Sequence, residues 1–185
     1  YVWCDGGYGN DYPDAIVSSP ASAKVTVTAV EAEEPATPRD PPSVSTVLNA
    51  TMAQLAATVT KPVFGTNAGE WTVLTLARGG YYTKDNSYFA DYYDRIVATV
   101  NEKAASINLN GALDKTKSTE NSRLILALSA IGKDATSVGD WDLIKPFEDF
   151  NWIKKQGLNG PVYALLALDS HNYQMEDTTI RQQCI

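Results

Sequence analysis

The sequence is poor in the residues that most often bind metals or form cross-links. It contains two cysteines, Cys4 and Cys184, and one histidine, His171. Two cysteines so far apart in sequence form neither a CxxC motif nor a disulfide-dense scaffold, and one histidine gives no helical Cys/His set for zinc. We therefore predict no metal site and no cofactor. Cys184 is expected to pack as a small apolar residue, with a Cys4–Cys184 disulfide as the alternative.

Clusters of basic residues and long apolar runs are also lacking. The chain has 15 Lys and Arg against 22 Asp and Glu, a net charge of -7. Its only basic doublet is Lys154-Lys155, and phosphate binding needs clustered Lys and Arg, so nucleic acid is not an expected partner. No apolar run reaches the length of a membrane span, so direct membrane insertion is not expected. The ends, Tyr1 and Ile185, suggest a piece cut from a longer protein.

The N-terminal part differs in composition from the rest. Residues 1–32 begin with turn-forming Gly, Tyr, Asp and Pro and end in a stretch, Lys24–Val30, that alternates Val with Thr as a strand does. A lone strand is unstable, so we interpret residues 1–32 as the remnant of a preceding β-domain. Residues 33–43 are acidic and rich in proline, and are expected to form a semi-rigid linker.

Residues 44–185 have helical periodicity throughout. The first predicted helix places Val44, Leu48, Met52, Leu55 and Val59 on one face, and Ser43 or Ser45 can cap it. The further predicted helices are Glu70–Arg78; one from Asn86 or Ser87 with Phe89, Tyr93, Ile96, Val97 and Val100 on one face; Asn121–Ile131, capped by Ser118 or Thr119 and ended by Gly132; one within Lys145–Lys155; Gly160–Leu168; and one capped by Asp177 or Thr178.

Amphipathic helices alternate with helices that are apolar on nearly every side. The apolar helices open near Trp71, Ser122 and Pro161, at a spacing that suits a repeated helix hairpin of roughly 40–50 residues. This alternation predicts two layers, with the inner helices buried on both flanks. The predicted fold is mainly α: a partial α/α toroid of helix hairpins in two layers, preceded by the β/loop segment and the linker.

The stretch QGLNGPVYALLALDSHNY at 156–173, preceded by TENSRLILALSAIGKDAT and WDLIKPFEDF, resembles a known family. It is similar to the prenyltransferase/squalene-cyclase-like (terpenoid cyclase-like) α/α toroid domains of bacterial cell-surface proteins, over residues 44–185. The resemblance implies a helical-repeat domain outside a bacterial cell. A full toroid has about six helix hairpins, and this chain holds roughly half of them.

The catalytic motifs of that family are not matched. Its cyclases use an Asp-x-Asp-Asp motif as proton donor, and the nearest sequence here, from Asp140 to Leu143, ends in Leu. We therefore predict no catalytic residue by resemblance, and an enzyme is the less expected outcome.

In such toroids the starts of the inner helices point into a common cavity, which gives the predicted ligand-binding residues. These are Glu70, Trp71, Glu120, Asn121, Arg123, Asn159 and Tyr163, with Tyr81 and Tyr82 as loop aromatics that could stack on a sugar ring. Each also has a structural interpretation, as a helix cap, a favourable charge at a helix N-terminus, or an ion pair.

The predicted function is an extracellular ligand-binding or interaction module of a bacterial surface protein, with a glycan, a small molecule or a protein as its partner. One alternative is an enzyme of terpenoid-cyclase-like or polysaccharide-processing type, if two of Glu70, Glu120, Asp140 and Asp142 share one cavity. The other is a structural spacer domain.

Overall fold

The computed structural model describes residues 42–66 and 68–185. Within these residues the chain forms seven α-helices, two short 3-10 segments and no strand of a sheet, which confirms the mainly α prediction. The predicted strand at 24–30 and nearly all of the predicted linker lie outside the described residues. The helices are α1 (Val44–Thr58), α2 (Glu70–Arg78), α3 (Ser87–Ile107), α4 (Ser118–Ala130), α5 (Phe150–Ile153), α6 (Asn159–Asp169) and α7 (Thr179–Gln183).

Several helix ends follow the capping chemistry of the sequence. The Ser43 hydroxyl accepts a hydrogen bond from the Thr46 N–H, and the Asn86 side chain accepts one from the Tyr88 N–H. Gly132 has a positive φ of 76° and ends α4 as predicted. The predicted cap of α4 is wrong, since Ser118 is its first residue and the N-cap is Lys117, which makes no side-chain bond.

The stretch predicted as one helix within Lys145–Lys155 is three short pieces. A 3-10 turn, Lys145–Glu148, holds Pro146 and ends at Asp149. The Asp149 carboxylate then accepts a hydrogen bond from the Asn151 N–H and caps α5, after which a second 3-10 turn, Lys154–Gln156, leads to Gly157. A proline at the start and a capping aspartate in the middle divide the stretch.

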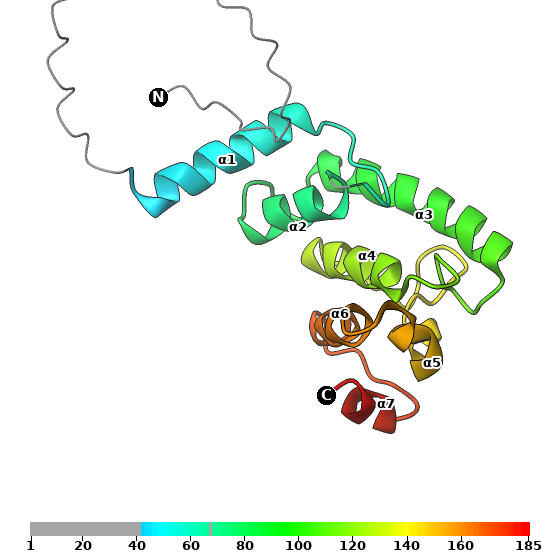
Figure 1. The fold of residues 1–185 in the computed structure, drawn as a ribbon. Helices are drawn as coiled ribbons and strands as arrows, with labels where there is room; N and C mark the ends of the chain where they lie inside the picture. The colour runs from blue at the N-terminus through cyan, green and yellow to red at the C-terminus, as the bar shows by residue number, and fades with distance from the viewer. Residues whose placement is uncertain (1–41, 67) are drawn as a thin grey trace, which may run out of the picture. The chain divides into compact units, whose positions relative to one another are not determined.

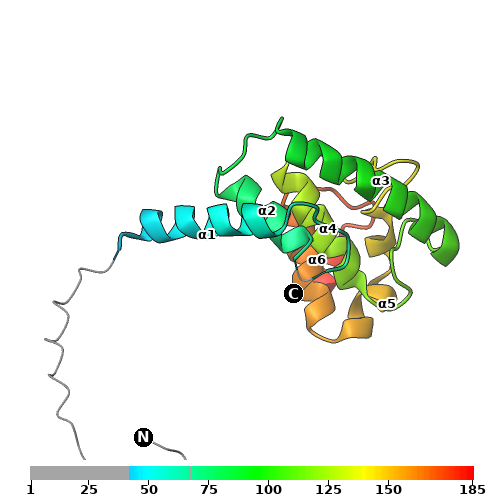
Figure 2. The ribbon, with the colours of Figure 1, turned by 90° about the horizontal axis from the view of Figure 1, so that it is seen from above.

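The three helices α2, α4 and α6 lie side by side in that order (Figure 1). The C-terminal ends of α4 and α6 lie together, since the Ser129 and Ser170 hydroxyls are 2.8 Å apart. The helices α3 and α5 lie on the same side of this row, apart from one another (Figures 1 and 2). Phe89, Tyr92, Ile96 and Val100 of α3 are buried in the common core.

The middle helix of the row is the most fully buried of the three. Nine of the 13 residues of α4 are buried. The outward flank of α6 is open, since Leu158, Val162 and Leu166 are 86%, 53% and 50% exposed. The prediction that the inner helices are buried on both flanks is therefore wrong for α6, because Val162 and Leu166 of that helix are half exposed.

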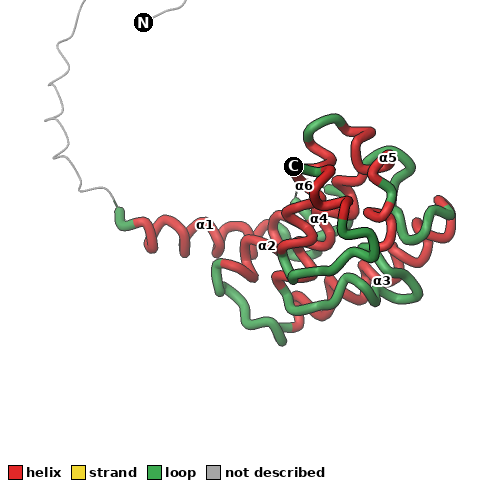
Figure 3. The backbone as a smooth tube through the Cα atoms, turned by 90° about the horizontal axis from the view of Figure 1, so that it is seen from below, coloured by secondary structure: helices red, strands yellow, loops and turns green. Residues whose placement is uncertain are grey.

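The first helix, α1, extends away from the other helices (Figure 3). Of its predicted apolar face only Met52 is buried and Leu55 and Val59 are partly buried, whereas Val44 and Leu48 are 85% and 45% exposed. The predicted face was thus correct for the C-terminal half, which contacts α2, and wrong for the N-terminal half, which projects beyond it.

A close backbone approach fixes the start of α6. Gly160 is buried, and a Cβ atom built on it would overlap the carbonyl oxygen of Ile153. Because the neighbour is backbone rather than a flexible side chain, neither segment can move aside without disturbing α5.

We therefore expect Gly160→Ala to lower the free energy of unfolding by about 1–3 kcal/mol, the usual cost of overpacking. In a helix free of such a contact, the same change would raise it by roughly 1 kcal/mol. Urea unfolding followed by circular dichroism checks the sign, with the exposed neighbour Asn159→Ala as control, expected within about 0.5 kcal/mol of the original chain. A stabilised Gly160→Ala protein would contradict the close approach.

Candidate functional site

The starts of α2, α4 and α6 surround one pocket. It has a volume of about 220 Å³ and is lined by Trp71, Thr119, Arg123, Gln156, Asn159 and Tyr163. Four of these were predicted as ligand-binding residues: Trp71, Arg123, Asn159 and Tyr163. The structure brings them together because the three helices run side by side in the same direction.

Two aromatic rings form the apolar part of the pocket. The rings of Trp71 and Tyr163 meet edge to face, with centroids 6.4 Å apart. Trp71 remains 37% exposed although its neighbours Glu70 and Thr72 are buried. An exposed tryptophan held by a second ring offers a rigid apolar surface to a ligand.

The side chain of Gln156 joins the start of α4 to the segment that precedes α6. Its Oε1 atom accepts a hydrogen bond of 2.9 Å from the Thr119 N–H, one of the first N–H groups of α4. With its oxygen held there, the Gln156 amide nitrogen is oriented as a donor. Neither Thr119 nor Gln156 was predicted as a site residue, and no signal short of the fold itself distinguishes them.

Glu120 and Arg123 form an ion pair on the first turns of α4. Glu120 Oε2 lies 2.6 Å from Arg123 Nη2, and their side chains are only 20% and 18% exposed. The Nε atom of Arg123 is buried and has no protein partner among the described residues. The predicted ion pair is confirmed, and it leaves part of the guanidinium free for a ligand.

Glu70 lies behind this pair, with 1% of its surface exposed. Its Oε1 accepts a hydrogen bond of 2.7 Å from the Gly65 N–H, while its Oε2 has no hydrogen-bond partner among the described residues. Desolvation raises the pKa of Glu70, against the opposing effect of the Gly65 N–H and of Arg123. Gly65 also lies beside Glu120, so the two carboxylates meet at this glycine.

The polar cluster continues onto α3. The Tyr92 hydroxyl and the Arg95 Nε are buried without a partner among the described residues. Desolvation, together with the nearby Glu70 charge, raises the pKa of Tyr92 well above its usual value.

Asn121 was predicted as a ligand-binding residue but is part of the core. It is fully buried, accepts from the Leu113 N–H at 2.8 Å, and donates to the carbonyls of Gly111 and Leu143 at 3.0 and 3.2 Å. These three hydrogen bonds hold two loops against α4. Asn121 therefore has a structural role and does not face the pocket.

Tyr81 and Tyr82 lie at the opposite end of α2 from the pocket. Tyr82 is half-buried and packs on Tyr88 and Phe89, with ring centroids 5.3 and 6.0 Å away. Tyr81 stacks edge to face on Tyr82 and is 38% exposed. The structure thus separates these two predicted residues from the other seven, and they do not form an exposed pair.

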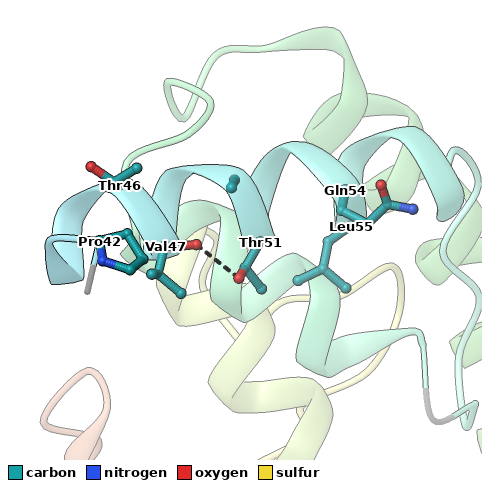
Figure 4. Close-up of a pocket in the computed structure, with 7 residues that line it drawn as sticks. Pro42, Thr46, Val47, Thr51, Gln54 and Leu55 are labelled. Carbon is teal, nitrogen blue, oxygen red and sulfur yellow. Dashed lines mark hydrogen bonds between the residues drawn. The ribbon is translucent and has the colours of Figure 1, made fainter. Parts of the chain in front are cut away.

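Two further hollows lie away from the helix starts. A groove of about 490 Å³ runs along α1 and is lined by Pro42, Thr46, Val47, Ala50, Thr51, Gln54 and Leu55 (Figure 4). It contains no charged side chain. A smaller pocket of about 180 Å³ lies beside Lys145, Glu148 and the buried Trp152.

The remaining chemistry of the described chain is limited. Asp140 is exposed, and Asp142 accepts a hydrogen bond from the Ile144 N–H in another part of the fold, so neither joins Glu70 and Glu120.

No group of three metal-binding side chains occurs in the described residues. None of the described helices is long and apolar enough to span a membrane. Cys184 is partly buried against the core, which raises the pKa of its thiol, and Cys4 lies outside the described residues.

Comparison of the chain with family models, with curated proteins and with solved structures gives no match.

The buried carboxyl of Glu70 predicts a pH dependence of stability. Its pKa in the folded chain is raised above the ordinary 4.5, so between these two values the folded chain binds more protons than the unfolded chain. The stabilising contribution is complete below pH 4.5 and is lost as the pH rises through the raised pKa. We expect Glu70→Gln to remove this loss in urea unfolding between pH 4 and 8.

The exposed Glu102 of α3 provides the matched Glu→Gln control. Its substitution should leave the decline of stability with pH in place. A Glu70→Gln protein that declines as steeply as the original chain would show that the buried carboxyl is not its source.

Proposed function

We propose that residues 44–185 form a ligand-binding module whose ligand occupies the pocket at the starts of α2, α4 and α6. The single observation that carries this proposal is the lining of the pocket. Residues from three separate segments converge there with an aromatic pair, a partly free arginine and an oriented amide. Convergent polar groups beside aromatic rings in a concave site are typical of ligand recognition.

A single sugar unit fits this pocket best. The volume of about 220 Å³ is below the range of roughly 300–1,000 Å³ for drug-sized ligands. The Trp71 ring offers an apolar surface, and the side chains of Gln156, Asn159 and Arg123 offer hydrogen bonds at its edge. This combination suits a ring with an apolar face and hydroxyl groups around it.

The proposed setting is the outside of a bacterial cell, with the helical repeat as part of an α/α toroid. The resemblance of residues 156–173 and of the two preceding segments to such domains supports this. The parallel row of α2, α4 and α6 is compatible with it. Secretion of the protein by a bacterial cell is the measurement that tests this setting.

Removing either aromatic ring should weaken binding. We expect Trp71→Ala and Tyr163→Ala each to lower affinity about tenfold or more, since buried aromatics dominate binding energy. The ligand is first identified by a thermal-shift screen of oligosaccharides, where a ligand at 100 times its Kd adds about 2.7 kcal/mol of stability. Calorimetric titration then compares the variants.

Tyr81→Ala is the matched control, because Tyr81 is also exposed but lies at the far end of α2. Its affinity should equal that of the original chain. Loss of binding in Tyr81→Ala with none in Trp71→Ala would move the site to the loop tyrosines.

A second candidate function is hydrolysis of a glycosidic bond. One observation favours it: Glu70 and Glu120 meet at Gly65 in contrasting surroundings. Burial raises the pKa of Glu70, and Glu120 is paired with Arg123. Two carboxyl groups close together in contrasting surroundings are an arrangement used in acid–base cleavage of a glycoside.

If the chain is such an enzyme, release of reducing sugar from a bound polysaccharide should be lost in both Glu70→Gln and Glu120→Gln. Asp140→Asn, which changes an exposed carboxylate elsewhere, should retain the rate. Binding without any release of reducing sugar by the original chain would rule out this candidate and leave the binding module.

A further inference from the structure

We propose that the ligand of this pocket is acidic, a sugar unit that carries a carboxylate. This inference rests on the proposed function and names its ligand class. It is carried by a group of lysines beside the pocket that the sequence does not show as a cluster, together with the partly free guanidinium inside it.

The lysines come from two segments that are distant in sequence. Lys115 and Lys117 precede α4, and Lys154 and Lys155 precede α6. The folded chain joins the segments, since the Lys155 ammonium donates a hydrogen bond of 3.1 Å to the Lys115 carbonyl. All four side chains are exposed, so we name these residues the lysine rim.

The lysine rim adjoins the pocket directly. Thr119 and Gln156 line the pocket. Lys117 lies two residues before Thr119, and Lys155 lies directly before Gln156.

The Lys155 ammonium lies on the Lys115 carbonyl and the Lys154 ammonium lies 5.8 Å from the centre of the Phe150 ring, so the positive charge is beside the pocket rather than inside it. Positive charge beside a concave site raises the local concentration of an anionic ligand. The net charge of -7 therefore does not describe the potential at this end of the chain.

Within the pocket, Arg123 provides the specific contact. Glu120 occupies Nη2 of its guanidinium, and no side chain among the described residues bonds to its other nitrogens. A guanidinium held in place by one carboxylate can bind a second one with little loss of freedom. The negative groups nearby are Glu120, Asp114 and Glu70, and the pKa of Glu70 is raised.

The backbone adds to the same preference. The N-cap residues of α2, α4 and α6 make no side-chain hydrogen bond, and at the start of α4 the Gln156 side chain accepts from the Thr119 N–H. The helix starts carry the partial positive charge of three aligned helix dipoles toward the pocket. These partial charges act in the same direction as Arg123 and the lysine rim, and against Glu120 and Asp114.

A carboxylated sugar explains the pocket better than a nucleic acid does. A nucleic-acid groove follows a backbone over several phosphates and stacks successive bases, whereas this pocket holds one unit beside one exposed ring. The carboxylate of such a sugar can reach Arg123 while its ring lies on Trp71.

The test compares trigalacturonic acid with its fully methyl-esterified form, which has the same shape and no charge. The full chain is titrated with each by calorimetry at 20 mM and 500 mM NaCl. We expect the acid to bind at least tenfold more tightly at low salt, and the difference to shrink at high salt as the lysine rim is screened. Equal affinities would overturn the acidic ligand and leave the proposed function standing.

Three variants test which residues cause the preference for the acid over its methyl ester. Arg123→Gln should abolish the difference between acid and ester, and Lys117→Gln with Lys154→Gln should halve it or more. Glu120→Gln should increase it, because it frees the guanidinium; this opposite direction excludes simple unfolding as the cause. Lys84→Gln, at the far end of α4 near Gly132, is the control and should change nothing.

The remaining outcomes are also decisive. Binding of cellotriose but not of trigalacturonic acid would overturn the acidic ligand and retain the sugar site. Tighter binding of an oligothymidylate, with competition against the acid, would overturn it in favour of nucleic acid. Absence of binding to all four probes would overturn both the acidic ligand and the sugar-binding function.

Discussion

The burial of α4 between α2 and α6 is the constraint on which the rest of the structure depends. Its apolar side chains fill the space between both neighbours, and the Asn121 amide ties the loops before and after it to the same helix. With α4 fixed in this way, the first turns of all three helices are held at one end of the row. The pocket exists because of that shared end, where Arg123 is paired with Glu120 and the buried Glu70 accepts a hydrogen bond from the Gly65 N–H.

Much of the fold could be predicted from the sequence. The apolar runs and their glycine ends located α2, α4 and α6 to within a few residues, because helix periodicity and chain breaks are local properties. The exposure of Val162 and Leu166 could not be predicted, since it depends on which helices are present as neighbours. The same applies to the first half of α1, whose apolar face has no described helix opposite it.

The candidate site was predictable only where a residue stands out by type. Trp71, Arg123 and Tyr163 are conspicuous at the starts of apolar helices, and they line the pocket. Asn121 looked equivalent in sequence, yet its amide bonds to three backbone groups that only the fold brings near. Lys115 and Lys117 looked like ordinary surface residues, because their neighbours Lys154 and Lys155 are some 40 positions away and meet them through the backbone of a loop.

The common direction of α2, α4 and α6 has an electrical consequence for the described part of the chain. Four lysines gather beside the starts of α4 and α6, whereas at the other ends of α2 and α4 Asp85 and Asp134 stand next to Lys84 and Lys133. A local group of positive charges can attract an anion even when the net charge of the molecule is negative. The four lysines would therefore affect the rate at which an anionic ligand associates, and would do so less as the salt concentration rises.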